Sequence, residues 1–160
     1  MKNFTKNLAL TITIIFCGIF SSYAYHKPAS LIYKASIMAR AEENFSNCKY
    51  KSALNLYIKL LKIDQNNTSV NFKAGLCCFN LPNSNENAIG YLKRACMSKD
   101  TLPEAFFYLG SIYQLEERFD EALQTFNHFL NFVKSNKNGR ELRSEVLLRI
   151  HMCLAAGDLL

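Results

Sequence analysis

The chain has 160 residues, of which 49% are apolar and 12% aromatic, and it carries a formal net charge of +6. This length suits one domain with a packed core, and the low glycine and proline content, 6 and 3 residues, disfavours a turn-rich all-β fold and favours helices. Acidic residues are interspersed with the lysines and arginines, so no basic stripe forms, which argues against a nucleic-acid partner.

Residues 1–24 are typical of a secretory signal peptide. Lys2 and Lys6 precede an apolar stretch at residues 8–20, and the segment ends in Ser-Tyr-Ala, with small residues where signal peptidase cuts. The apolar stretch is shorter than the roughly 20 residues that a membrane-spanning helix needs. We therefore expect cleavage after Ala24 and export of the protein, with an uncleaved transmembrane helix as the alternative.

After residue 33, a pattern of small and large residues recurs with a period of about 34 residues. Residues 25–33 form a leading segment, in which Pro28 can open a helix that continues into the first repeat. We place the three repeats at residues 34–67, 68–102 and 103–136. The small residues are Ala41, Gly75 and Gly110 in the first half of each repeat, and Ala53, Ala88 and Ala122 in the second half.

Each repeat is expected to fold as two antiparallel helices joined by a turn. Small residues at facing positions let the two helices approach closely, and larger residues there would splay them. The large residues Tyr57, Leu92 and Phe126 are expected to fill the space between successive hairpins. Because one hairpin cannot bury that face alone, successive hairpins must stack as in a solenoid.

Residues 139–160 are predicted to form a C-terminal capping helix. The sequence Asn-Lys-Asn-Gly at residues 136–139 breaks the chain after the third repeat. Apolar residues then recur at helical spacing, at Val146, Leu147, Ile150, Cys153 and Leu154. Charged residues lie mostly on the opposite side, so we expect this helix to cover the last repeat and to present a polar face to solvent.

The third repeat carries the tetratricopeptide pattern nearly complete. Gly110, Tyr113, Ala122 and Phe126 follow one another at offsets of 3, 9 and 4 residues. The chain resembles the tetratricopeptide-repeat family over residues 34–133. The resemblance implies an all-α fold, an antiparallel helix-hairpin solenoid of three repeats with a C-terminal capping helix, that holds another protein.

The sequence offers no constellation of residues for catalysis. It contains no nucleophile elbow, phosphate loop, zinc-binding H-E-x-x-H motif or dinucleotide fingerprint, and its three histidines are isolated. We therefore predict a protein that is not an enzyme, that uses no cofactor or metal, and that takes no small-molecule substrate.

Five of the six cysteines follow the signal peptide, and two of them, Cys77 and Cys78, are neighbours. A helix points adjacent side chains about 100° apart, so we expect this pair to pack in the core. A thiol-active or metal-binding protein built on Cys77 and Cys78 is the alternative. An oxidising compartment would also allow one disulfide among Cys48, Cys77, Cys78, Cys96 and Cys153.

In tetratricopeptide folds the first helix of each hairpin lines a concave face. The resemblance places nine residues in this groove: Met38, Glu42, Phe45, Phe72, Leu76, Phe79, Phe107, Ser111 and Gln114. Some relatives grip a carboxylate there with basic residues and asparagine, but this chain has Met38, Glu42, Phe72 and Phe107 at those places. The expected ligand is an apolar helical or extended protein segment. Alternatively, the aromatic residues only pack on one another.

A narrower resemblance rests on Tyr108-Leu109-Gly110-Ser111-Ile112-Tyr113 followed by Arg118-Phe119-Asp120-Glu121-Ala122. With the signal peptide, these residues are similar to the amino-terminal domain of Bacteroidetes envelope proteins that continue into a β-propeller and a peptidoglycan-binding OmpA-like domain. This implies a scaffold in the periplasm or at the outer membrane, with an envelope or secretion-complex protein as partner and membrane association only through other proteins. The alternative is that the chain is the truncated or partial amino-terminal arm of such a protein.

Overall fold

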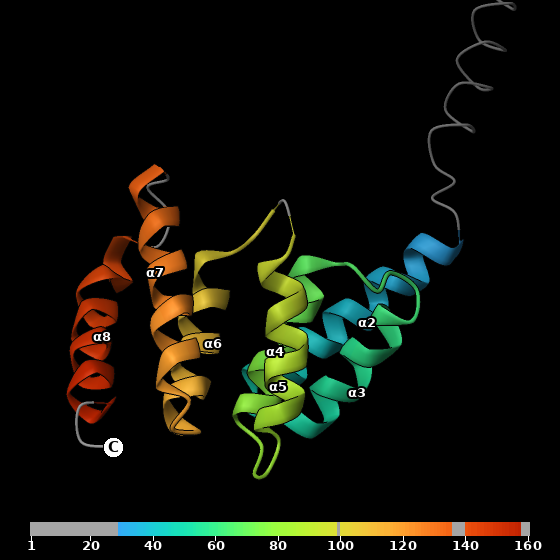
Figure 1. Cartoon of the computed structure of the whole chain (residues 1–160). Helices are drawn as coiled ribbons and strands as arrows, with labels where there is room; N and C mark the ends of the chain where they lie inside the picture. The colour runs from blue at the N-terminus through green and yellow to red at the C-terminus, as the bar shows by residue number, and fades with distance from the viewer. Residues whose placement is uncertain (1–28, 99, 136–139, 158–160) are drawn as a thin grey trace, which may run out of the picture. The chain divides into compact units, whose positions relative to one another are not determined.

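All regular secondary structure in the described residues is helical. A computed structural model describes residues 29–98, 100–135 and 140–157. The helices are α2 (Ala29–Ser46), α3 (Tyr50–Leu61), α4 (Thr68–Phe79), α5 (Asn85–Cys96), α6 (Pro103–Leu115), α7 (Phe119–Ser135), the short 3-10 helix η1 (Arg140–Leu142) and α8 (Arg143–Gly157) (Figure 1). The predicted signal peptide, Pro28 and the predicted break at residues 136–139 lie outside the described residues.

The chain divides into two compact units, residues 1–36 and 37–160, with the boundary inside α2. In the first unit the described part is the start of α2, where Leu31, Ile32 and Tyr33 are exposed. Also within this unit, the Ser36 hydroxyl donates a hydrogen bond to the Tyr33 carbonyl at 2.8 Å. Among the described residues of both units, no helix is both long and apolar enough to cross a membrane.

Local sequence determines where helices of the second unit begin and where the chain turns between the two helices of a hairpin. The Asn67 side chain accepts a hydrogen bond from the Val70 N–H at 3.0 Å and so caps the start of α4, while Pro103 occupies the first turn of α6. Each hairpin turn contains one residue with a left-handed backbone, namely Cys48 (φ 56°), Asn83 (φ 52°) and Glu117 (φ 58°). The first and third hairpins close with the same hydrogen bonds, from the Lys49 N–H to the Asn44 carbonyl and from the Arg118 N–H to the Tyr113 carbonyl, whereas the second turn is longer.

The small residues of each repeat lie where the two helices of a hairpin meet, as predicted. Ala41, Ala53, Ala88 and Ala122 are fully buried. A Cβ atom added at Gly75 would lie 2.7 Å from Cγ of Leu92. At Gly110 it would lie 2.5 Å from Cε1 of Phe126. These distances leave no room for a side chain, which explains glycine at the closest approach of α4 to α5 and of α6 to α7.

The large residues of the second helices are buried in the core clusters, together with residues of the neighbouring hairpins. Leu92 and Phe126, which were expected to fill the space between successive hairpins, also pack on the glycine of their own hairpin. Tyr57 likewise bonds within its hairpin, because its hydroxyl donates to Glu42 of α2 at 2.7 Å. The small residue in the first helix makes the space, and the large residue in the second helix fills it.

Successive hairpins stack into one continuous core. The second helix of one hairpin contacts the first helix of the next, at α3 with α4, α5 with α6, and α7 with α8. Buried residues form two clusters, one around Tyr57 and Val70 and one around Phe107 and Phe126. The half-buried side chains Leu54 and Tyr91 pack against both clusters and so join them.

Helix α8 covers the end of the third hairpin but does not present a polar face. Val146 and Cys153 are buried against α7 and α6, as predicted. The prediction that the remaining surface is polar is wrong. Leu147, Leu148, Met152 and Leu154 are all exposed, with Leu148 exposing 61% of its surface. The reason is the register of the helix, since its apolar residues that face the preceding hairpin are Val146, Cys153 and part of Ile150.

Candidate protein-binding surface

The nine residues predicted to line the groove all lie in the first helices of the hairpins, α2, α4 and α6. We call the surface that they form the first-helix surface. Helix α4 contacts α6, and α6 contacts α8, so the first helices of neighbouring hairpins lie next to one another. The fold therefore brings residues about 35 positions apart in the sequence into one row.

Two of the predicted residues lie in the core beneath this surface. Phe107 exposes only 8% of its surface and Ser111 is buried, with its hydroxyl donating a hydrogen bond to the Phe107 carbonyl at 2.8 Å. They support the surface from below. The others are half-buried and keep part of their side chains accessible, namely Met38, Glu42, Phe45, Phe72, Leu76, Phe79 and Gln114.

The centre of the first-helix surface is an aromatic cluster around Tyr108, which the sequence analysis did not select. The Tyr108 ring lies 6.1 Å from that of Phe72, 5.6 Å from that of Phe79 and 5.3 Å from that of Phe107, measured between ring centroids. The aromatic residues do pack on one another, as the alternative interpretation predicted. Phe72, Phe79 and Tyr108 nevertheless stay partly exposed, so part of each ring remains accessible on the first-helix surface.

Charged groups at the α2 end of the surface are paired with each other. Glu42 accepts hydrogen bonds from the Tyr57 hydroxyl at 2.7 Å and from the Lys73 ammonium at 3.0 Å. Lys73 also lies 4.5 Å from the centroid of the Phe45 ring. Burial, together with the hydrogen bond to Glu42, raises the pKa of the Tyr57 phenol. This network fixes Glu42 and Lys73 in place and leaves neither charge unbalanced.

At the other end, Arg149 of α8 extends the surface beyond the predicted residues. Its guanidinium lies 5.1 Å from the centroid of the Phe107 ring and donates to the Gln114 side-chain oxygen at 3.2 Å. It also forms an ion pair with Glu145 at 2.9 Å. Arg149 could have been selected from its position next to Ile150, which packs against the core. Because α8 contacts α6 as α6 contacts α4, residues of α8 extend the row of first helices.

The vicinal cysteines lie in the core and their thiols are not activated. Cys77 and Cys78 are both buried, and burial raises the pKa of the Cys77 thiol to about 12 and of the Cys78 thiol to about 11. A nucleophilic cysteine needs a lowered pKa and an accessible sulfur. Packing is therefore the role that the geometry supports for this pair. The five described cysteines are free thiols.

The helical arrangement is similar to that of solved structures at low sequence identity. The TPR2B domain of yeast Sti1, in a complex with pHsp70, matches with a TM-score of 0.69 at 14% identity, over 78% of this chain and 98% of that chain. The Yersinia enterocolitica type III secretion chaperone SycD, in complex with a peptide of the translocator YopD, matches with a TM-score of 0.62 at 17% identity, over 78% and 92%.

A third similar structure is that of the MamA protein, with a TM-score of 0.66 at 19% identity over 77% of this chain. The match covers 63% of the MamA chain, so it spans less than two thirds of that protein. No protein-family model and no curated protein matches the sequence. Together, the helix pairs, their small contact residues and these likenesses show that the chain has the tetratricopeptide-repeat fold, an all-α solenoid of three helix hairpins closed by a C-terminal helix.

Proposed function

We propose that this protein is a non-catalytic scaffold that binds a protein segment on the first-helix surface. The observation that carries the proposal is the partly exposed aromatic cluster of Phe72, Phe79 and Tyr108, held rigid by a buried layer that includes Phe107. Rigid aromatic side chains with accessible edges are the residues that most often anchor a protein ligand. Two proteins of similar fold, Sti1 and SycD, were solved as complexes with pHsp70 and with a YopD peptide.

The chemistry of the first-helix surface favours an apolar ligand over an acidic one. Lys73 is already paired with Glu42, and Arg149 with Glu145. A ligand carboxylate would have to compete with these partners. We therefore expect apolar anchors in the ligand, spaced along an amphipathic helix or an extended segment.

The proposed location is outside the cytoplasm, in the periplasm or at the outer membrane. The support is the signal-peptide pattern of residues 1–24. The partner would then be an envelope or secretion-complex protein, and contact with the membrane would run through such partners. A second form of this proposal makes the chain the amino-terminal arm of a larger OmpA-like envelope protein, with the same surface docking that protein into a complex.

A peptide-display selection on the purified protein tests the proposed function. We expect enriched peptides to carry apolar residues at helical or alternating spacing, and to lose at least tenfold in affinity when Phe72 and Phe79 are both changed to serine. The matched control is Met97→Ser, because Met97 is a large apolar residue with 83% exposure in the segment after α5. Melting temperatures of both variants show whether a loss reflects unfolding. Equal binding by a folded Phe72→Ser/Phe79→Ser variant would refute the proposal.

A further inference from the structure

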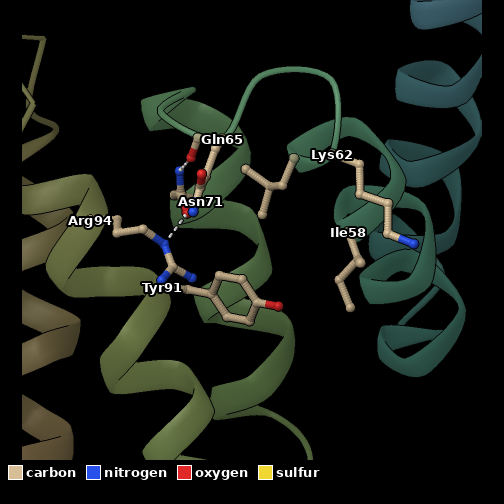
Figure 2. A pocket seen from close by; sticks show the side chains of 7 residues that line it. Ile58, Lys62, Gln65, Asn71, Tyr91 and Arg94 are labelled. Carbon is tan, nitrogen blue, oxygen red and sulfur yellow. Dashed lines mark hydrogen bonds between the residues drawn. The ribbon is translucent and has the colours of Figure 1, made fainter.

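A pocket lies apart from the first-helix surface, between α3, α4 and α5. Its volume is about 370 Å³, and its walls include Ile58 and Leu61 of α3, Asn71 of α4, and Tyr91 and Arg94 of α5 (Figure 2). None of these residues belongs to the first-helix surface. We call this hollow the Arg94 pocket.

A buried amide fixes the orientation of Arg94. Asn71 is fully buried, and its Nδ2 donates hydrogen bonds to the backbone carbonyls of Gln65 at 2.8 Å and Asn67 at 2.9 Å. Because a carbonyl can only accept, these two bonds leave the Asn71 Oδ1 atom pointing toward α5. That oxygen accepts a hydrogen bond from Nε of Arg94 at 3.0 Å.

An aromatic ring holds the other side of the same guanidinium. The central carbon of the Arg94 guanidinium lies 4.9 Å from the centroid of the Tyr91 ring, and Figure 2 shows the group next to this ring and bonded to the Asn71 amide. Planar stacking suits guanidinium and would not hold an ammonium in the same way. Arg94 is thus ordered before any ligand arrives, which lowers the entropy lost on binding.

The outer face of this guanidinium is left for a ligand. In the described parts of the chain, Arg94 forms no ion pair, and its two terminal amino groups have no acceptor. None of the described residues that line the pocket is acidic. Lys62 at its edge adds a second positive charge, although Figure 2 shows Lys62 extending away from Arg94. Ile58, Leu61 and the Tyr91 ring supply apolar walls beside these charges.

We propose that the Arg94 pocket binds a carboxylate carried next to an apolar side chain. The terminal N–H groups of Arg94 form a planar fork that matches the two oxygens of a carboxylate, and the apolar group would pack between Ile58, Leu61 and Tyr91. Such a ligand is either the C-terminal residue of a peptide or an internal acidic residue beside an apolar one. The site is independent of the first-helix surface and does not rest on the proposed function.

The direct test uses N-acetyl-leucine as the probe and N-acetyl-leucinamide as its uncharged counterpart. In NMR titrations we expect N-acetyl-leucine to shift the Arg94 Nε–H signal and the methyl signals of Ile58 and Leu61 in a saturable way. The amide should bind at least tenfold more weakly. Equal binding of the acid and the amide, or shifts confined to other residues, would overturn the proposal.

Three variants show whether Arg94 recognises the carboxylate through its fork. Arg94→Gln should abolish binding, and Arg94→Lys, which keeps the charge but loses the fork, should weaken it at least fivefold. The matched control is Arg118→Gln. The Arg118 guanidinium also lies over a tyrosine, 4.6 Å from the centroid of the Tyr113 ring, but its Nε already donates a hydrogen bond to the Glu121 carboxylate at 2.9 Å. Unchanged binding by Arg94→Gln, or loss of binding by Arg118→Gln, would contradict the assignment.

Longer peptides then identify the source of the carboxylate. One peptide ends in leucine with a free carboxylate, and the other has an internal Glu-Leu pair and an amidated end. Tighter binding by the first indicates a C-terminal ligand, and tighter binding by the second an internal acidic motif. Either result supports the pocket, whereas Arg94-independent binding of both would overturn it.

Discussion

Single residues decide how closely the two helices of each hairpin approach. At Gly110 a side chain would collide with the ring of Phe126, which is itself fully buried and surrounded by other core residues. The ring cannot move aside without disturbing the core, because packed interiors have few voids. Gly90, in contrast, lies in α5 with open space where its side chain would be.

These two glycines should respond in opposite ways to alanine. We expect Gly110→Ala to lower the free energy of unfolding by about 1–3 kcal/mol, because overpacking outweighs the gain in helix propensity. Gly90→Ala should raise it by about 0.5–1 kcal/mol, since only the propensity changes. Urea denaturation measures both values. Equal effects of the two substitutions would contradict the close approach of α6 and α7 at Gly110.

The buried thiols predict how stability changes at alkaline pH. Burial raises the pKa of Cys77 to about 12 and that of Cys78 to about 11, above the ordinary value near 9. The folded state therefore holds these protons more tightly than the unfolded state, and its stabilisation is complete below pH 9 and declines from pH 9 to about 12. Denaturation midpoints between pH 8 and 10.5 should fall less in Cys77→Ala than in the parent protein. A parallel fall in both proteins would contradict this origin.

At the scale of the element, each hairpin turn contains a left-handed residue, and in all three turns that residue is one other than glycine. Cys48 is exposed and has φ 56°, a conformation in which a side chain on Cβ is strained. We expect Cys48→Gly to raise the free energy of unfolding by about 1 kcal/mol. The neighbouring exposed residue, Asn47, has no positive φ, so Asn47→Gly should give no gain. Chemical denaturation of the two variants checks the difference, and a gain in both would point to a cause other than backbone strain.

Helix α8 should tolerate changes on one side only. Val146 is fully buried, and Val146→Ala should lower the free energy of unfolding by about 1–2 kcal/mol. Leu148 and Met152 expose more than half of their surface, and lysine at either position should change stability by less than about 0.5 kcal/mol. Thermal melts of the three variants provide the measurement. A large loss on Leu148→Lys would show that this side of α8 is covered in solution.

The sequence predicted the helix pairs because their contacts are encoded by spacing. Ala41, Gly75 and Gly110 recur at intervals of about 34 residues, and a position with little room for a side chain is recognisable in the sequence as alanine or glycine. Burial on the first-helix surface was harder to predict. Phe107 and Phe72 occupy equivalent positions, yet only Phe107 is buried, since Arg149 of α8 covers it.

Contacts between helices explain the residues that the sequence analysis missed. Tyr108 meets Phe72 and Phe79 only because α4 and α6 lie side by side. The Arg94 pocket depends on a hydrogen bond between Asn71 of α4 and Arg94 of α5. An asparagine at position 71 interrupts the apolar pattern of its helix, but the sequence alone does not show which residue it bonds. Spacing along the chain identifies which residues share a helix face, but not which side chain of the next helix they reach.

At the largest scale, stacking joins the hairpins of residues 37–160 through one core. Each hairpin of the second unit buries its open side against the next, and Leu54 and Tyr91 link the two clusters of the core. Stability in such an array depends on contacts between neighbouring hairpins. The same stacking places the rings of Phe72, Phe79 and Tyr108 together on the first helices, which is the basis of the proposed binding function.

The most direct test of that function is an NMR map of the surface that a bound peptide covers. A peptide enriched by selection is titrated into the isotopically labelled protein, and the shifted amide and side-chain signals are assigned. The account predicts that shifts concentrate on α4 and α6, around Phe72, Phe79 and Tyr108, and that Phe72→Ser/Phe79→Ser removes them. Saturable binding that shifts only the second helices α3, α5 and α7, and that survives the double substitution, would contradict it.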